Sequence, residues 1–529
     1  MIGNSENDSG MVLDDAASLP AGEMRAYEIP GMPPLALFNV GGAFFATSNV
    51  CTHNVAILTD GSFEGNVVEC PLHGGAFDVR TGEAVSYPCE KAIDCFRVKK
   101  DGNEIRIFSE INRASATDEF VEEIAGRTAA HQAVDFTKHA TTRTATAAET
   151  AVEVAAESVA ANPSSLRTNT VSGPLASKRA EMLVASSADR RVWIEGRAAP
   201  FICEAGDTIL RSALRQGIGF PYECNSGGCG SCVFETVSGE TADLSDESSS
   251  ATGLSEKAHL RGSRLGCQAI PLTDCVIKVR QSDSFIPIEP PRRRAARLRS
   301  VVPLTHDMAA FTFESSGEAK FLPGQYALLK KRDGQVERAY SMSNTENEAG
   351  LWEFVIKQVP GGKFSTNITS QLDVIDGMVL DGPYGNAYLQ VESMRPVLCI
   401  AGGAGLSPML SILRGAIRDP SFKERSLSLF YGARTPMDLW DATVLEDNAV
   451  LGKRVQWVNA LSDVAPASGN SWDGPTGFIH TVVAARLGTR IKDFEIYLSG
   501  PPPMTDAVQR MLLLDYRVPS QQIHFDRFY

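Results

Sequence analysis

Two groups of cysteines and histidines in this 529-residue sequence are spaced as metal ligands often are. The first group pairs a cysteine with a histidine twice, with sixteen residues between the pairs, and consists of Cys51, His53, Cys70 and His73. Two thiolates and two imidazoles would complete a four-ligand site. Such a set suits structural zinc as well as an iron–sulfur cluster, so zinc remains an alternative here. A further alternative is that the two histidines are ordinary surface residues of loops.

The second group contains only cysteines, three close together and one distant, namely Cys224, Cys229, Cys232 and Cys267. Its first gap holds the four residues 225–228, whereas four-cysteine zinc sites normally use two CxxC pairs. Zinc is the alternative here too. Glycines in this gap would let backbone N–H groups turn toward bound sulfide. We interpret the other five cysteines as small buried apolar residues: Cys89, Cys95, Cys203, Cys275 and Cys399.

The first group resembles the Rieske [2Fe-2S] family, in which two histidines replace two cysteines on one iron. The resemblance covers about residues 20–110. It implies that Cys51 and Cys70 hold one iron. It also implies that His53 and His73 hold the other iron and face the electron partner.

Two departures place this module among Rieske proteins of the ferredoxin type. Respiratory Rieske proteins carry a disulfide at positions that are Ala56 and Leu72 here. The loop at residues 74–76 also offers no hydroxyl donor to the cluster sulfurs. We therefore expect a potential near the low end of the roughly −150 to +300 mV Rieske span.

The second group resembles the plant-type [2Fe-2S] ferredoxins, which share its Cx4Cx2C spacing and its distant fourth cysteine. That resemblance implies that Cys224, Cys229, Cys232 and Cys267 are the ligands of a second [2Fe-2S] cluster.

Two later segments resemble the ferredoxin–NADP reductase superfamily. The segment RAYSMSN carries its RxYS motif, which implies that Arg338 meets the flavin phosphate, Tyr340 packs on the isoalloxazine and Ser341 approaches N5. An arginine suits a phosphate because its guanidinium can bind in bidentate fashion. The segment IKQVPGGKFS matches the superfamily's diphosphate-contacting segment through Lys357, Gly361, Gly362 and Ser365. The domain order favours FAD over FMN.

The segment CIAGGAGLSPML follows an apolar strand and precedes a helix. Its glycines Gly402, Gly403 and Gly405 would bring backbone N–H groups close to a dinucleotide pyrophosphate. The segment resembles the GGxGxxP motif of the same superfamily. That resemblance assigns Arg434, in YGAR, and Ser499, in SGPPPM, to the nicotinamide nucleotide. Ser499 replaces the usual cysteine of the family.

Two expectations about the cofactors depend on single residues. Phe528, near the C-terminal end, is expected either to stack on the flavin or to pack in the protein. NADH is expected over NADPH, because Asp438 near Arg434 would disfavour a 2′-phosphate and because oxygenase reductases of this order generally use NADH.

The segments that must position these residues predict a multidomain chain. Short apolar stretches broken by Gly, Asp and Asn predict small antiparallel sheets, and apolar strands separated by helices predict a parallel α/β sheet. A tract rich in Ala, Thr, Ser and Glu predicts a tether, with a short helix at 118–130. The expected order is an all-β Rieske domain at 20–112, a flexible linker at 113–187, a β-grasp ferredoxin domain at 188–283, an antiparallel FAD-binding β-barrel at 292–392 and an α/β NAD-binding domain at 393–529.

Composition and charge exclude some classes of binding partner and favour others. A net charge of −14 argues against a nucleic-acid binder. The chain has no apolar run long enough for a membrane helix and no secretory signal, so we expect a cytoplasmic protein. Residues 1–110 carry sixteen acidic and seven basic side chains, which favours docking of this region to a basic protein surface.

Residues 191–529 resemble the benzoate-dioxygenase-reductase class, to which the Rieske module is an addition. The resemblance implies electron transfer from NADH through FAD, the plant-type cluster and the Rieske cluster to a separate terminal oxygenase, and a Rieske non-haem iron oxygenase is favoured. A diiron monooxygenase or a cytochrome P450 is the alternative acceptor. A redox-sensing protein and a nitrite-reductase accessory chain are alternatives of other classes.

Overall fold

The structure is a computed structural model. It describes residues 10–111 and 188–526, apart from gaps at 14, 30–31, 54, 72–73, 103, 245–252, 332–336, 363, 366–377, 441–446 and 464–471. The expected linker, its short helix, His73 and Phe528 lie outside the described residues. Within the described ranges, each helix is too short or too polar to cross a membrane.

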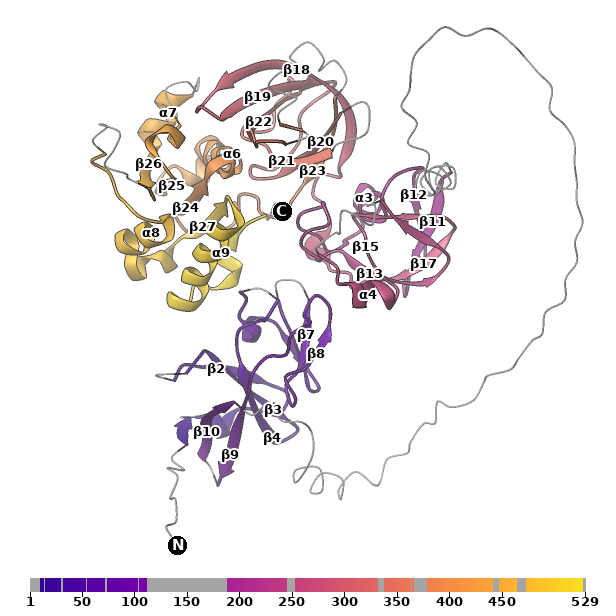
Figure 1. Cartoon of the computed structure of the whole chain (residues 1–529), viewed down its shortest axis with the longest axis vertical. Coiled ribbons are helices and arrows are strands. Elements are labelled where there is room, and N and C mark those ends of the chain that lie inside the picture. Colours follow the sequence, from indigo (N-terminus) through magenta and orange to yellow (C-terminus); the bar gives the residue numbers. More distant parts are fainter. Residues whose placement is uncertain are drawn as a thin grey trace, which may run out of the picture. The chain divides into compact units, whose positions relative to one another are not determined.

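The first module, residues 11–111, is built from two antiparallel sheets (Figure 1). The larger has the order β1-β10-β9-β4-β3-β2, with β1 Met11–Leu13, β2 Met24–Tyr27, β3 Leu35–Val40, β4 Ala43–Ser48, β9 Cys95–Asp101 and β10 Glu104–Ile111. The smaller joins β5 Ser62–Glu64, β6 Val67–Glu69, β7 Ala76–Asp78 and β8 Ala84–Ser86 in sequence order. Gly41 and Gly42 form the tight turn between β3 and β4, where positive φ angles of 59° and 101° favour glycine.

The second module, residues 188–285, is a mixed sheet packed on a helix, which is the predicted β-grasp arrangement (Figure 1). Its sheet has the order β12-β11-β17-β13-β15, and β11 and β17 run parallel. The strands are β11 Arg190–Ile194, β12 Phe201–Cys203, β13 Val233–Ser238, β15 Ser263–Leu265 and β17 Cys275–Lys278, and β14 Thr241–Asp243 pairs with β16 Ala269–Pro271. Helix α3 Ile209–Arg215 begins at Thr208, whose hydroxyl accepts the backbone N–H of Arg211, and α4 spans Glu256–Leu260.

The third module is a six-stranded antiparallel sheet in the order β21-β20-β23-β18-β19-β22. The strands are β18 Arg292–Pro303, β19 Met308–Ser315, β20 Tyr326–Lys331, β21 Glu337–Ser341, β22 Leu351–Lys357 and β23 Met378–Tyr384. An antiparallel bridge between Met342 and Phe354 joins the two end strands, so the sheet curls into a barrel (Figure 1). Its interior is aromatic, with Phe311, Phe313 and Trp352 fully buried.

The fourth module is a parallel sheet in the order β26-β25-β24-β27-β28 (Figure 1). The strands are β24 Val397–Gly402, β25 Leu427–Ala433, β26 Val455–Leu461, β27 Glu495–Ser499 and β28 Ile523–His524, and the helices are α6 Leu406–Arg418, α7 Asn448–Arg454, α8 Ile479–Leu487 and α9 Pro502–Arg510. The strand order reverses between β24 and β27. In open α/β sheets, ligands bind beyond the carboxyl ends of the strands at such a reversal.

Short helical turns complete the connections. They are the 3₁₀ turns Ala16–Ser18, Leu58–Asp60, Asp283–Phe285, Gly403–Gly405, Pro420–Phe422, Pro436–Asp438, Gly488–Asp493 and Ser520–Gln522, and a π-helical turn at Met511–Asp515.

Candidate redox and nucleotide sites

The first cysteine and histidine group lies on two loops of the first module. Cys51 follows β4 and Cys70 follows β6, and both side chains are buried in one hydrophobic core. The backbone N–H of Cys70 donates to the carbonyl of Gly75 at 2.8 Å, which closes its loop into a tight turn. His53 is exposed, and His73 lies outside the described residues. Two buried thiols beside an exposed imidazole fit a cluster that has one protected iron and one iron near solvent.

Cys89 contributes a third sulfur to this core, and its position in the chain does not predict a contact with the other two cysteines. Its Sγ atom lies 3.5 Å from the Sγ of Cys51, and its side chain is buried. A Cβ atom at Gly75 would fall 2.3 Å from the same sulfur, so glycine is required where the second loop passes Cys89. The contact with Cys51 and burial raise the pKa of the Cys89 thiol far above its ordinary value, and either sulfur of the pair could be the donor. A Cys51 thiolate bound to iron could only accept, so the Cys89 S–H would then be the donor.

We expect the Cys89→Ala substitution to lower the reduction potential of the Rieske centre. Hydrogen bonds to ligand sulfur favour the more negative, reduced state of a cluster. One such bond contributes about 0.5–1.5 kcal/mol, which corresponds to a fall of roughly 20–60 mV for a one-electron couple. A redox titration followed by electron paramagnetic resonance (EPR) measures it. Cys95→Ala, in strand β9 of the same module, is the control, and equal potentials in both variants would contradict the prediction.

The second group comes together at one buried point. Cys224, Cys229 and Cys232 lie between α3 and β13, and Cys267 lies between β15 and β16, and each is at most 4% exposed. Left-handed backbone at Asn225 and at the glycines 227 and 230 turns the chain around the thiols. Contact with Cys229 lowers the pKa of Cys224 to about 5, so this pair readily supplies a thiolate.

Unpartnered polar atoms mark the same place. Among the described residues, the amide nitrogen of Asn225 and the hydroxyl of Ser231 are buried without a hydrogen-bond partner. Buried polar groups are almost always paired in folded proteins, so these two donors indicate a missing acceptor. Four converging thiols and two spare donors fit a [2Fe-2S] cluster, whose ligand and bridging sulfurs accept hydrogen bonds.

The predicted flavin residues occupy the end strand β21 and the segment after β22. Arg338 is exposed, whereas the ring of Tyr340 lies 5.4 Å from that of Phe364. Ser341 is buried, and its hydroxyl has no hydrogen-bond partner among the described atoms. An orphaned hydroxyl at the end of the RxYS motif fits a flavin, whose ring carries both donors and acceptors.

The second flavin segment forms a turn that is closed by a serine. The hydroxyl of Ser365 accepts the backbone N–H of Val359 at 3.1 Å. A Cβ atom at Gly362 would fall 2.7 Å from that hydroxyl oxygen, and Gly361 has a positive φ of 72°. Lys357 differs from these three residues, because its ammonium pairs with the carboxylate of Asp307 at 2.9 Å.

The nucleotide residues meet at the reversal of the parallel sheet. Gly402 ends β24 and Gly403 and Gly405 form the next turn, while Ser499 ends the adjacent strand β27. A Cβ atom at Gly405 would fall 2.1 Å from the carbonyl oxygen of Ser499, so the two segments touch and exclude any larger residue. Arg434 is exposed beyond β25. This edge presents backbone groups at the N-terminus of α6, as a pyrophosphate requires.

The flavin strand and the nucleotide loop are directly linked. The hydroxyl of Ser407, in the first turn of α6, donates to the carbonyl of Ser341 at 2.7 Å and accepts the backbone N–H of Val355 at 3.0 Å. Two cofactors bound at these two segments would therefore be neighbours.

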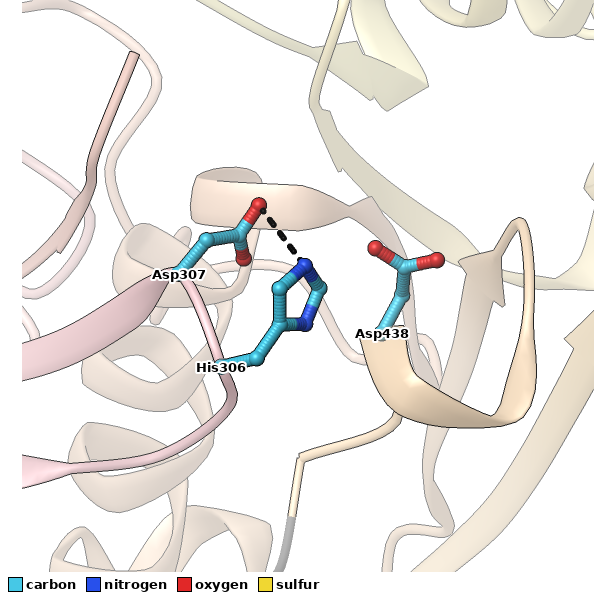
Figure 2. Close-up of side chains that lie close together, drawn as sticks. All are labelled: His306, Asp307 and Asp438. Carbon is cyan, nitrogen blue, oxygen red and sulfur yellow. Dashed lines mark ion pairs between the residues drawn. The ribbon is translucent and has the colours of Figure 1, made fainter. Parts of the chain in front are cut away.

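His306, Asp307 and Asp438 gather beside this link, with ligand atoms within 4.8 Å of one another (Figure 2). Their spacing would suit a metal ion. However, the ammonium of Lys357 lies 2.9 Å from the Asp307 carboxylate and 4.0 Å from that of Asp438, so a cation already neutralises the group. Asp438 also accepts the N–H and the hydroxyl of Thr435. Because this carboxylate is buried and turned inward, it gives less reason to exclude a 2′-phosphate than the sequence suggests.

Comparison with known protein families finds four matching family models along the chain. Family models match in chain order as the Rieske [2Fe-2S] domain at residues 9–97, the 2Fe-2S iron–sulfur cluster binding domain at 192–272, the oxidoreductase FAD-binding domain at 295–388 and the oxidoreductase NAD-binding domain at 399–510. A matching domain is thereby present for each cofactor type that the sequence predicts.

Relatives and a solved structure match a large part of the chain. The ferredoxin–NAD(P)(+) reductase CarAd of Metapseudomonas resinovorans is 42% identical over 341 residues, which are 64% of this chain and 98% of the relative. The ferredoxin–NAD(+) reductase component of an alkene monooxygenase system from Xanthobacter autotrophicus is 36% identical over 63% of this chain and 98% of its own length. The solved ferredoxin reductase in carbazole 1,9a-dioxygenase is 41% identical and matches 64% of this chain and 98% of its own, with a TM-score of 0.59.

Proposed function

Because this chain belongs to the ferredoxin–NAD(P)(+) reductase components of oxygenase systems, we propose that it oxidises NADH and delivers single electrons to a separate oxygenase through its own Rieske centre. One observation carries the proposal. Relatives such as CarAd match 64% of this chain with 98% of their own length, and a Rieske domain occupies residues 9–97 in addition. A reductase and a Rieske electron carrier are thus joined in one polypeptide.

Different groups of residues would serve the two-electron and the one-electron chemistry. When bound, a flavin accepts two electrons from a nicotinamide and releases them singly to [2Fe-2S] clusters. The glycine turn at 403–405 would hold the dinucleotide, and Ser341 and Tyr340 would orient the flavin ring. The hydrogen bond from Ser407 to Ser341 keeps these two sites adjacent. The four cysteines of the second module and the loops of Cys51 and Cys70 would hold the clusters.

The proposal also includes FAD and NADH as the cofactors and the cytoplasm as the location. We propose FAD because the barrel matches an FAD-binding domain, and NADH because reductases of this domain order generally use it. Arg434 is exposed and could contact a 2′-phosphate, so the ratio of kcat/KM for NADH and NADPH tests the preference. None of the eleven cysteines, all of them described, forms a disulfide, and this state is typical of cytoplasmic proteins.

For the partner, we propose a Rieske non-haem iron oxygenase. A solved structure that matches the reductase modules is the ferredoxin reductase of a carbazole dioxygenase system. Because another relative serves an alkene monooxygenase system, a diiron or other monooxygenase is the alternative acceptor. The acidic excess of residues 1–110 suits a basic docking surface on either partner.

Electron paramagnetic resonance of the anaerobic, NADH-reduced protein tests the proposal. Two distinct [2Fe-2S] signals are expected, and the one with the lower average g value belongs to the histidine-ligated cluster. A single plant-type signal would show that the Rieske centre is absent or is disconnected from NADH.

Removal of residues 1–112 is expected to abolish NADH-driven turnover of the oxygenase and to spare NADH oxidation by artificial acceptors. The remaining chain resembles a whole reductase, since CarAd matches this chain over 341 residues that make up 98% of its own length. The measurement compares product formation with ferricyanide reduction. Undiminished product formation by the shortened protein would rule out this exit for electrons.

A further inference from the structure

The loop that carries Cys224 is bonded to the flavin barrel at the residues on both sides of this cysteine. The hydroxyl of Tyr326 donates to the carbonyl oxygen of Glu223 at 2.7 Å. One residue earlier, the hydroxyl of Tyr222 accepts the backbone N–H of Gly385 at 3.0 Å. These contacts join residues 103 and 163 positions apart, so no local sequence pattern predicts them.

A third contact holds the other side of Cys224. Arg211, in helix α3, donates through Nε to the side-chain oxygen of Asn225 at 3.3 Å. The two terminal nitrogens of the same guanidinium donate to both carboxylate oxygens of Glu337 at 3.2 and 2.5 Å. Glu337 begins strand β21 and precedes Arg338 of the RxYS motif. The cluster loop is therefore tied to the strand that carries the flavin residues.

Tyr326 makes the shortest connection between the two sites. It begins strand β20, where it is the direct cross-strand partner of Ser341. Its side chain is fully buried, and its ring lies 5.9 Å from that of Tyr384. The connection from the flavin strand to a cluster ligand thus contains only the Ser341–Tyr326 pairing, the Tyr326 hydroxyl and Glu223. By contrast, the Tyr384 hydroxyl donates to Asp381 and makes no described hydrogen bond to the cluster loop.

We propose that Tyr326 is a positioning residue that holds the Cys224 side of the plant-type cluster against the flavin strand and makes it the entry point for electrons. The inference rests on the proposed function and adds the route within it. Electron transfer falls steeply with distance, so a loop released from the Tyr326 hydroxyl would slow the flavin-to-cluster step. The step in which NADH reduces the flavin does not involve the cluster loop, so its rate would not change.

The test is stopped-flow reduction of the full holoprotein by NADH, in Tyr326→Phe and in the matched control Tyr384→Phe. Both changes remove one hydroxyl from the same aromatic group, but only the first removes a bond to the cluster loop. In Tyr326→Phe we expect bleaching of the flavin at the wild-type rate and slower reduction of the cluster, by about tenfold. Misplacement by 1 Å can cost enzymes about 100-fold, so a smaller shift of the loop should cost less. The control should match the wild type in both rates.

Further readouts separate the outcomes. The EPR spectrum of the dithionite-reduced Tyr326→Phe cluster should be unchanged, because the ligands are intact. Wild-type transfer rates in Tyr326→Phe, or equal slowing in both variants, would overturn the inference. If Tyr326→Phe does not retain flavin, Arg211→Lys is the second variant, because it removes the guanidinium bonds that link Asn225 to Glu337. The same two rates are measured, and slower cluster reduction with unchanged flavin reduction is expected. A wild-type cluster that NADH cannot reduce would instead refute the proposed function.

Discussion

In the Cys229→Ser variant, NADH is expected to leave the Rieske centre oxidised, although dithionite still reduces it. Cys229 is one of four buried cysteines that converge in the second module, and serine is a poor ligand for an iron–sulfur cluster. Plant-type centres lie near −400 mV, well below the roughly −150 to +300 mV of Rieske centres, so electrons would pass downhill from the former to the latter. Without the plant-type centre, this series is interrupted.

The EPR signal of the reduced Rieske centre after anaerobic addition of NADH measures this effect. In the variant, we expect no such signal on the time scale of normal turnover. Cys203→Ala is the matched control. Cys203 is equally buried in the same module, but its sulfur contacts Ser212 and the carbonyl of Asp207 rather than the four converging cysteines. Rapid NADH reduction of the Rieske centre in Cys229→Ser would mean that electrons bypass the plant-type cluster.

The sequence best predicts sites whose residues lie only a few positions apart in the chain. Candidate ligands such as Cys224 and Cys229 are separated by a few residues, so their proximity follows from the length of the chain between them. The multidomain fold class is confirmed by the matching family models, because each module carries its own hydrophobic period and motif. The boundaries of the modules and the roles of individual residues remain predictions.

Contacts between distant segments could not be predicted in this way. Cys89 meets Cys51 across 38 residues, and nothing in its local sequence distinguishes it from Cys203. The ammonium of Lys357 pairs with Asp307, fifty residues earlier in the chain, and the assignment of Lys357 to the flavin diphosphate stays a prediction. Tyr326 is an ordinary strand residue until the register places it opposite Ser341. Such pairings depend on tertiary packing, which a single sequence does not display.

The largest expected effect on stability comes from the buried ion pairs between the ferredoxin module and the barrel. Arg215, in α3, donates to both carboxylate oxygens of Asp381 at 2.8 and 2.6 Å and also pairs with Asp207 at 2.9 Å. Arg293 pairs with Asp207 from the other side at 2.5 Å. Asp381 and Asp207 are at most 4% exposed. The largely buried Arg215 and the partly exposed Arg293 therefore neutralise two buried carboxylates.

The Asp381→Ala substitution should lower the free energy of unfolding by about 3–5 kcal/mol, because it leaves Arg215 without its main buried partner. Urea unfolding followed by flavin fluorescence measures the loss. Arg297→Ala is the control, since Arg297 is 59% exposed and its pair with Glu314 is screened by water, so its loss should change stability little. Equal losses in the two variants would contradict the prediction.

Acid should reproduce the effect in the unmodified protein. Burial by itself would raise the pKa of Asp381, but hydrogen bonds and charge from Arg215 outweigh it and hold this pKa below the ordinary 3.8. A carboxylate whose pKa is lower in the folded state contributes stability that is fully present above its unfolded pKa and is lost as the pH falls through its folded pKa. The stability gap between the wild type and Asp381→Ala should therefore be constant near neutral pH and should narrow below about pH 4. A gap that persists unchanged at lower pH would show that packing, rather than the ion pair, accounts for the loss.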